Sequence, residues 1–568
     1  MTAPLRVGNC SGFYGDRFTA MREMLEGGPL DVLTGDYLAE LTMLILARDR
    51  AKDPATGYAK TFLRQVEQCL GLALDQGVTL VSNAGGVNPA GLADALRALA
   101  DRLGLNATVA YVDGDDLLPR AAEFGFGEPL AAHAYLGGWG IAAAVGSGAD
   151  IVVTGRVTDA SLTVGPAAAH FGWTPADLDA LAGATVAGHV IECSAQATGG
   201  NYSFFTELGL DGRPLGFPIA EIADDGSSVI TKHPETGGAV TVGTVTAQLL
   251  YEVAGARYAG PDVTARLDTV QLSQQDPDRV RISGVRGEPP PPTYKVSLNS
   301  LGGFRNQIEF VLTGLGIEAK AALVRDQLPV PDAVWTLART DHPDATVEEE
   351  ASALLRCVVR GPDPKQLGRA FSGAAVELAL SSYPGCHLTA PPGDATPYGV
   401  FTAGSVAVTE VPHVAVLADG TRVDIPPAPI TAPLTELADP PLTFDYIGGG
   451  PKRRLPLGTL AGARSGDKGD SANIGVWVRG PDWPWLVSTL TVDSIRELLP
   501  ETAELPIVRY LLPNLNALNF VIDGLLGQGV AYNNRFDPQA KALGEWLRSR
   551  IVDIPDGTLR SRRLGLPK

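Results

Sequence analysis

Short apolar runs alternate with longer amphipathic stretches through about the first 190 residues. Strands alternating with crossover helices give this pattern, so it predicts a mostly parallel sheet. The expected strands are 5–7, 31–34, 79–81, 107–112 and 151–154, and the expected helices are 17–25, 58–74, 90–103, 131–145 and 160–171.

From about Gly188 onward the chain changes to shorter β-rich segments separated by turns, which is typical of an α+β region. The expected elements are strands at 228–232, 239–251 and 279–285 and a helix at 364–382. The predicted organisation is an α/β part over 1–188, an α+β part over 189–425, a Pro- and Gly-rich linker over 426–455, and a small α+β domain over 456–568.

The chain is acidic, since 45 Lys and Arg residues face 64 Asp and Glu residues and give a net charge of −19. This balance opposes general binding to nucleic acid or to anionic membranes, so an anionic substrate needs a local cationic patch. The five cysteines are scattered and form no CxxC pair, which argues against a disulfide frame and a zinc ribbon. The N-terminus enters a strand pattern at once and no segment reaches membrane-spanning length, so we expect a cytoplasmic protein.

Polar, glycine-rich loops follow the predicted parallel strands. Ligands of open parallel sheets lie outside the carboxyl ends of the strands, so these loops are expected to share one site. The first loop does not match the dinucleotide fingerprint and the chain has no phosphate loop, so no cofactor is identified. Taken singly, each loop also fits a helix cap or turn. The candidates for substrate binding are Asn9, Ser11, Asn83, Gly85, Gly86 and Arg156, and those for proton transfer are Asp36 and Asp159.

The segment 189–202 carries the densest group of reactive side chains. His189 and Glu192 are candidates for general acid or base, and Cys193 would be a nucleophile only beside a cation. On a strand His189 and Cys193 would share one face and Glu192 would point the other way, which weakens a triad. A buried free cysteine is the simpler interpretation of Cys193. His189 and Glu192 lack a clear third ligand, so no metal site is predicted.

Two further loops carry cations among glycines, as anion-binding loops do. The first, 231–238, contains Lys232 and His233. The second, 462–473, contains Arg464, Asp467, Lys468 and Asn473 and lies between two strand-like segments. Both also fit ordinary turns.

Several long motifs occur in order along the chain: GNCSGFYGDR, LTGDYLAELTM, SNAGGVNP, VVTGRVTDASL, GHVIECSAQATGGNYS, TKHPETGG, TAQLLYE and ARSGDKGDSANIG. Together they resemble the acyclic terpene utilisation (AtuA-like) family over nearly the whole chain. The C-terminal part resembles the small ferredoxin-like domain of that family. The resemblance supplies no catalytic residues, so the candidates above rest on their chemistry alone.

The resemblance implies bacterial catabolism of acyclic terpenes through branched acyl-CoA thioesters. One hypothesis is an enzyme that acts on a branched acyl-CoA or related carboxylate by hydratase, lyase or hydrolytic chemistry. The other is a non-catalytic subunit or scaffold that binds the acyl-CoA carboxylase or dehydrogenase of the pathway. We also expect a homo-oligomer, and no nucleic-acid or membrane partner.

Overall fold

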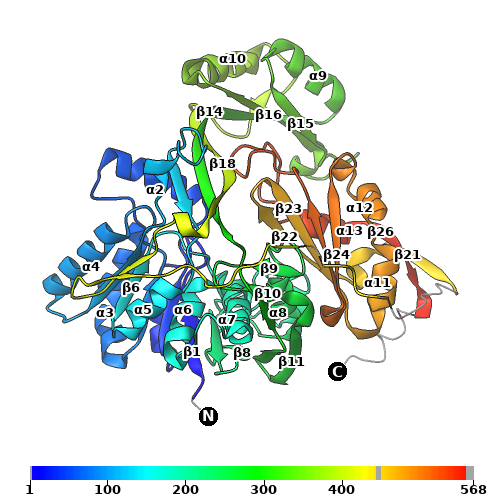
Figure 1. Ribbon diagram of the computed structural model, residues 1–568. Coiled ribbons are helices and arrows are strands. Elements are labelled where there is room, and N and C mark those ends of the chain that lie inside the picture. Colours follow the sequence, from blue (N-terminus) through cyan, green and yellow to red (C-terminus); the bar gives the residue numbers. More distant parts are fainter. Residues whose placement is uncertain (1–2, 436, 443–449, 558, 560–568) are drawn as a thin grey trace. The chain divides into compact units, whose positions relative to one another are not determined.

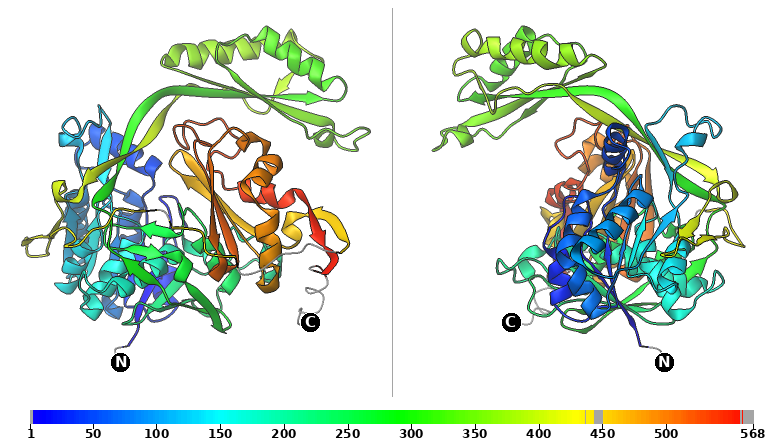
Figure 2. Two further views of the ribbon diagram at one scale, coloured as in Figure 1. Left: turned by 45° about the vertical axis from the view of Figure 1, so that its right-hand side comes forward. Right: turned by 90° about the vertical axis from the view of Figure 1, so that its left-hand side faces the viewer.

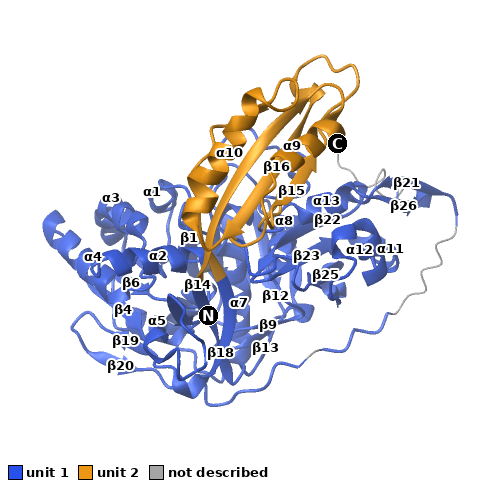
Figure 3. Ribbon diagram, turned by 90° about the horizontal axis from the view of Figure 1, so that it is seen from above, with its two compact units in different colours: residues 1–299, 401–530, 539–568 blue, residues 300–400, 531–538 orange. Residues whose placement is uncertain are grey.

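The computed structural model describes residues 3–435, 437–442, 450–557 and 559. Residues 436 and 443–449 of the predicted linker lie outside this set. The chain forms two compact units (Figure 3). Unit 1 comprises 1–299, 401–530 and 539–568, and unit 2 comprises 300–400 and 531–538. No described helix is both long and apolar enough to cross a membrane.

The N-terminal part of unit 1 contains the expected parallel strands, which pair in the order β1 (Leu5–Asn9), β2 (Val32–Gly35), β3 (Thr79–Ser82), β6 (Ile151–Thr154) and β4 (Val109–Asp113) (Figure 1). Antiparallel strands extend this sheet on both sides, so the complete sheet is mixed. One side adds β7 (Pro218–Ile222), β8 (Ser228–Lys232), β12 (Arg279–Ser283) and β11 (Gln271–Asp276), and the other adds β19 (Val414–Val416) and β20 (Arg422–Asp424).

The parallel strands are mostly apolar because helices cover both faces of the sheet. Ile151 and Val153 pack into one core with three of the helices, and Val152 points into the opposite core with three others. The first core contains α1 (Ala20–Glu26), α3 (Lys60–Gln76) and α4 (Pro89–Leu103), and the second contains α5 (Trp139–Gly146), α6 (Ser161–Phe171) and α7 (Leu178–Ile191). Helix α2 (Glu40–Lys52) follows β2.

Three sequence predictions for this unit were wrong. The segment 131–145 is not one helix, because β5 (Ala131–Ala134) precedes α5 and Gly137 and Gly138 separate them. The expected strand 239–251 is mostly helix α8 (Val242–Leu249), which begins at a reciprocal capping box between Thr241 and Thr244. His189 lies on helix α7 and not on a strand. A small sheet of β9 (Arg257–Ala259), β10 (Thr264–Arg266) and β13 (Arg286–Glu288) packs against α7.

The C-terminal domain belongs to unit 1 and contains a four-stranded antiparallel sheet. Its order is β22 (Gly462–Lys468), β23 (Ser471–Trp477), β25 (Ala517–Ile522) and β24 (Ile507–Leu512). The expected polar loop 462–473 is therefore a hairpin, and Gly469 at its turn has a φ of 68°. The remaining elements are α11 (Trp483–Thr489), α12 (Val492–Leu498), α13 (Leu543–Ser549), β21 (Lys452–Pro456) and β26 (Ile551–Pro555).

Unit 2 is a smaller α+β body. Its sheet contains β15 (Val334–Ala338), β16 (Ser352–Gly361) and β17 (His387–Leu388). It also includes residues 300–313 of the long strand β14 (Thr293–Thr313) and residues 396–400 of its partner β18 (Thr396–Ala407). Helices α9 (Ile317–Gln327) and α10 (Phe371–Glu377) cover one face (Figure 2). The predicted helix 364–382 corresponds to a π-helical turn at Gln366–Ala370, then α10, then a 3₁₀ turn.

Candidate functional site

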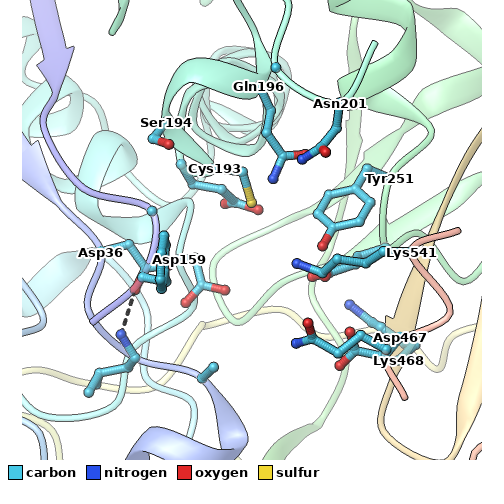
Figure 4. Close-up of a pocket in the computed structure, with 18 of the residues that line it drawn as sticks. Asp36, Asp159, Cys193, Ser194, Gln196, Asn201, Tyr251, Asp467, Lys468 and Lys541 are labelled. Atoms are coloured by element: carbon cyan, nitrogen blue, oxygen red, sulfur yellow. Dashed lines mark hydrogen bonds between the residues drawn. The ribbon is translucent and has the colours of Figure 1, made fainter. Parts of the chain in front are cut away.

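A cavity of about 560 Å³ lies in unit 1 where the carboxyl ends of the parallel strands meet the C-terminal domain (Figure 4). Its walls come from segments that are far apart in the sequence. Charged side chains dominate the lining: the carboxyl groups are Asp36, Asp159, Glu192, Glu252 and Asp467, and the cations are Arg156, Lys295, Lys468 and Lys541.

Asp36 reaches the cavity from the loop that follows β2 and is 4% exposed. Its Oδ1 accepts hydrogen bonds from Asn83 Nδ2 at 2.5 Å and from the backbone N–H of Leu38 at 3.0 Å. Burial, reinforced by the charge of Asp159, raises the pKa of Asp36 well above its usual range although Arg156 acts in the opposite direction. Asp36 therefore retains a proton more readily than an ordinary aspartate.

Arg156 and Asp159 come from the loop that follows β6. Their side chains are 3.1 Å apart. The Arg156 guanidinium also lies over the ring of Tyr135, 4.3 Å from its centroid, and donates to the carbonyl of Leu38 at 3.3 Å. Arg156 is thus held from three directions at the wall of the cavity, and its charge keeps the Asp159 carboxylate close.

His189 and Glu192 lie at the C-terminal end of α7, one helical turn apart, so they share a face. His189 Nδ1 is 3.1 Å from Glu192 Oε1. The sequence-based argument that Glu192 points away from His189 was wrong, because it assumed a strand. Gly188 permits the close approach of α7 to the loop after β6, since a Cβ there would lie 2.9 Å from Ala160 Cα.

Glu192 is almost fully buried, and its Oε2 has no hydrogen-bond partner among the described residues. Burial, with Asp159 and Glu252 nearby, raises the pKa of Glu192 well above its usual range, against the pull of Lys468 and Arg156. Burial and the charge of Lys468 lower the pKa of His189 to about 4. Glu192 therefore retains a proton more readily than an ordinary glutamate, and the imidazole beside it is neutral at neutral pH.

Cys193 follows Glu192 and also lines the cavity. Burial and the surrounding carboxylates raise the pKa of its thiol well above the usual value. This environment opposes formation of the nucleophilic thiolate, and Cys193 is a free cysteine that is only half-buried.

Three residues that line the cavity have left-handed backbone conformations without being glycine. They are Ser194 with a φ of 55°, Asn201 with 55° and Glu252 with 56°. Such conformations cost free energy and persist only where the surrounding structure fixes them, which is common at functional sites.

Across the cavity from Asp36 and Asp159, Figure 4 shows Tyr251, which follows α8, and Asp467, Lys468 and Lys541 of the C-terminal domain. The Arg464 guanidinium stacks on the Tyr251 ring, 4.0 Å from its centroid, and donates to Gln196 Oε1. The C-terminal domain therefore contributes to the cavity wall within the same chain.

Two asparagines of the C-terminal domain form hydrogen bonds to the backbone of residues 250–253, which follow α8. Asn473 Oδ1 accepts from the backbone N–H of Glu252 at 2.9 Å, and its Nδ2 donates to the carbonyl of Leu250 at 2.7 Å. Asn519 Oδ1 accepts a second bond from Asn473 at 2.9 Å, and Asn519 Nδ2 donates to the carbonyl of Val253 at 3.0 Å. Asn473 therefore positions the backbone of the cavity wall.

The structure brings most of the predicted residues to the cavity. Those that line it are Asp36, Arg156, Asp159, Glu192, Asp467 and Lys468. Others support the lining residues from behind: Asn83, His189, Arg464 and Asn473 through the contacts above, Asn9 by a 3.5 Å bond from its Nδ2 to the Glu192 carbonyl, and Ser11 by a 2.9 Å bond to the Asp36 carbonyl.

The other four predicted residues neither line the cavity nor serve as such supports. Lys232 lies on β8 and pairs with Asp278 at 3.3 Å, and His233 bonds the Met24 carbonyl at 2.9 Å. Gly85 and Gly86 serve close packing, since a Cβ at Gly85 would lie 2.4 Å from the Thr154 carbonyl oxygen and Gly86 has a φ of 56°.

Sequence reasoning missed several lining residues, notably Tyr135, Glu252, Lys295 and Lys541. Glu252 could have been suspected because it ends the TAQLLYE motif. Lys295 and Lys541 lie in an ordinary strand pattern and next to a helix pattern, so nothing local marks them. Among the described residues, no group of three or more His, Cys, Asp or Glu side chains has the arrangement of a metal site.

Comparison with known proteins identified two family models. The model described as acyclic terpene utilisation family protein AtuA matches residues 5–417, and the AtuA ferredoxin-like domain matches residues 455–553. No curated protein and no solved structure matched the chain. The first match alone covers more than half of the sequence and includes the strand ends and α7. The chain therefore belongs to the acyclic terpene utilisation family AtuA and carries the family's ferredoxin-like domain at its C-terminal end.

Proposed function

We propose that the protein is an enzyme that acts on a branched acyl-CoA thioester or a related carboxylate by acid–base chemistry. One observation carries the proposal: a carboxyl group with a raised pKa, Glu192, adjoins a neutral histidine and faces a cavity with cations on its other wall. Carboxyl groups tuned toward neutrality are suited to proton transfer at physiological pH. Family membership supplies the link to acyclic terpene utilisation.

The charge of the cavity favours an anionic ligand although the whole chain is acidic. If Asp36 and Glu192 retain their protons, the four cationic side chains of the lining outnumber the three other carboxylates. The cavity volume lies within the range of small-molecule sites. Lys468 and Lys541 on one wall and Arg156 on the other are the groups proposed to hold a carboxylate or phosphate.

The proposed roles follow from these positions. Glu192 donates a proton to the developing enolate or leaving oxygen of the substrate, and His189 supports it through the Nδ1–Oε1 contact. Asp159, held by Arg156, accepts a proton on the same wall. A proton donor (Glu192) and a proton acceptor (Asp159) on one wall suit hydration or its reverse, in which one group protonates carbon and another activates water.

The alternative is a non-catalytic subunit that binds acyl-CoA enzymes. A binding surface would have no need of a buried carboxyl group without a hydrogen-bond partner or of left-handed residues around an internal cavity. The enzyme hypothesis accounts for both features.

A ligand panel tests the proposal. The full-length protein is titrated calorimetrically with 3-methylcrotonyl-CoA, isovaleryl-CoA and the two free acids, and each mixture is then analysed by mass spectrometry for turnover. We expect binding and conversion of at least one compound by the wild type, with binding weakened in Lys468→Met. Lys452→Met, an exposed lysine on β21, is the control. Absence of binding and turnover across the panel, together with co-purification of a carboxylase or dehydrogenase, would support the scaffold instead.

A further inference from the structure

Asp115 and His133 form a buried pair behind the cavity, outside its lining. Both side chains are 3% exposed, and Asp115 Oδ2 is 2.8 Å from His133 Nδ1. Asp115 lies in the loop after β4, and His133 lies on β5. An uncompensated buried charge is costly, so such a pair persists only where both partners are well held.

The same oxygen of Asp115 reaches the loop that carries Arg156. Oδ2 also accepts a hydrogen bond from the backbone N–H of Arg156 at 2.8 Å. The preceding residue, Gly155, leaves room for the carboxyl group, because a Cβ there would lie 2.3 Å from Asp115 Oδ1. Asp115 therefore fixes the backbone of the loop at the residue whose guanidinium lines the cavity.

Strand β5 and the residues that follow it also bond the backbone of Asp115 and Arg156. The Ala134 N–H donates to the Asp115 carbonyl at 2.8 Å, and the Leu136 N–H donates to the Arg156 carbonyl at 3.1 Å. Between them, Tyr135 presents the ring on which the Arg156 guanidinium lies. One short run of backbone thus connects His133, the stacking ring and the Arg156 loop.

We propose that Asp115 and His133 are positioning residues that set the place of Arg156, and through it Asp159, in the cavity. The inference rests on the proposed function for its catalytic consequence, but the link from Asp115 to Arg156 is independent of any substrate. It also explains why an Asp–His pair is retained at a buried position outside the cavity lining.

The charge state of His133 depends on the groups around it. Burial alone would lower the pKa of His133, but the hydrogen bond and charge of Asp115, with the charge of Asp116, outweigh burial and raise it. Arg50 opposes them, and Arg50 itself lies 3.6 Å from Asp116. His413, also near Asp115, has a pKa lowered by burial to about 4 and accepts from the Gly140 N–H.

A double-mutant cycle separates positioning from simple stabilisation. Affinity for 3-methylcrotonyl-CoA is measured calorimetrically in the wild type, Asp115→Asn, Arg156→Met and the double variant. We expect Asp115→Asn to weaken binding about 10-fold or more in the wild type, because small displacements of binding groups have effects of this order. In the Arg156→Met background the same change has little further effect, since coupled residues are not additive. Equal losses in both backgrounds would overturn the proposal.

Asp262→Asn is the matched control. Asp262 is also buried and its Oδ2 accepts a backbone N–H at 2.7 Å, but the donor is Gly138, which precedes α5 and is not part of the Arg156 loop. We expect this variant to be destabilised without a loss of affinity. An affinity loss equal to that of Asp115→Asn would contradict specific positioning.

A measurement without ligand tests the Asp115–His133 pair even if the proposed function is wrong. The His133 imidazole is titrated by NMR in the wild type and in Asp115→Asn, with His133→Gln used to assign its signal. We expect its pKa to lie above the ordinary value in the wild type and to fall below it in the variant, where burial prevails. No change between the two proteins would refute the pair. If the pair is present but no thioester binds the wild type, the proposed substrate is wrong. The positioning of Arg156 by Asp115 is then tested by a crystal structure of Asp115→Asn, in which we expect Arg156 to be displaced.

Discussion

Glu192 Oε1 lies 3.1 Å from Nδ1 of His189, one turn earlier on the same buried helix. The two groups have opposite pKa shifts, because burial favours the neutral form of each. Glu192 thus retains its proton more readily than an ordinary glutamate, beside an imidazole that is uncharged at neutral pH. The proposed acid–base chemistry depends on this contact between Glu192 and His189.

Substitution of Glu192 by Gln keeps the shape of the side chain and removes the transferable proton. We expect kcat to fall by about 10²- to 10⁴-fold, the usual contribution of a general acid or base, while KM changes little. Steady-state kinetics on the thioester identified by the ligand panel provide the measurement. A kcat within about two-fold of wild type would exclude Glu192 as the proton carrier.

The same substitution changes the dependence of stability on pH. The folded pKa of Glu192 is raised, so its contribution to stability is fully present below the unfolded value of 4.5 and is lost as pH rises toward the folded pKa. We therefore expect the stability of the wild type relative to Glu192→Gln to fall as pH rises above 4.5, by up to about 1.4 kcal/mol per pH unit. Urea unfolding at several pH values measures the difference. A difference that does not change with pH would show that folding does not raise the pKa of Glu192.

Gly12 packs its backbone against the C-terminal end of α7. A Cβ at this position would lie 2.9 Å from Cys193 Cα and 3.0 Å from the Glu192 carbonyl oxygen, which are backbone atoms that cannot yield locally. We expect Gly12→Ala to displace Glu192 and to reduce kcat at least 10-fold. Gly15→Ala, whose Cβ would meet only the Phe13 ring at 3.1 Å, is the control and should retain activity. Equal activities of the two variants would contradict the assigned position of Glu192.

Asn473 joins the C-terminal domain to the backbone of Leu250 and Glu252. Replacement by Asp keeps the acceptor for the Glu252 N–H but leaves the Leu250 carbonyl without its donor and adds a buried charge. We expect Asn473→Asp to destabilise the protein by about 1–3 kcal/mol and to weaken ligand binding, because the wall with Tyr251 and Glu252 loosens. Chemical unfolding and calorimetry test both effects. Unchanged affinity despite lower stability would show that this joint does not shape the site.

The parallel strands were predictable because their residues are buried on both faces and read as continuous apolar runs between polar ends. The placement of Asp36 and Arg156 in one site could be predicted from these strands, because the carboxyl ends of parallel strands share one edge of the sheet. The helical state of α7 was not predictable from periodicity. Nearly all of its residues are buried, so no polar face gives the 3.6-residue period, and the position of His189 relative to Glu192 was inverted.

The remaining errors have similar physical origins. The β-branched segment that begins α8 favours a strand by propensity, but the Thr241 capping box and its packing override this preference. Lys232 was suggested by a glycine-rich loop, yet its ammonium group is engaged by Asp278 and the Thr236 carbonyl. Lys295 and Lys541 come to the cavity only through tertiary folding, so no local pattern reveals them.

Proton transfer between Glu192 and the ligand would exchange hydrogen at the ligand with solvent, and deuterium incorporation detects this exchange. The thioester identified by the ligand panel is incubated with the full-length protein in D₂O, and the label at its α-carbon and in any product is followed by NMR. We expect incorporation with the wild type and at least a 100-fold slower rate with Glu192→Gln. A thioester that binds the cavity but acquires no deuterium, or equal rates for the two proteins, would contradict proton transfer by Glu192.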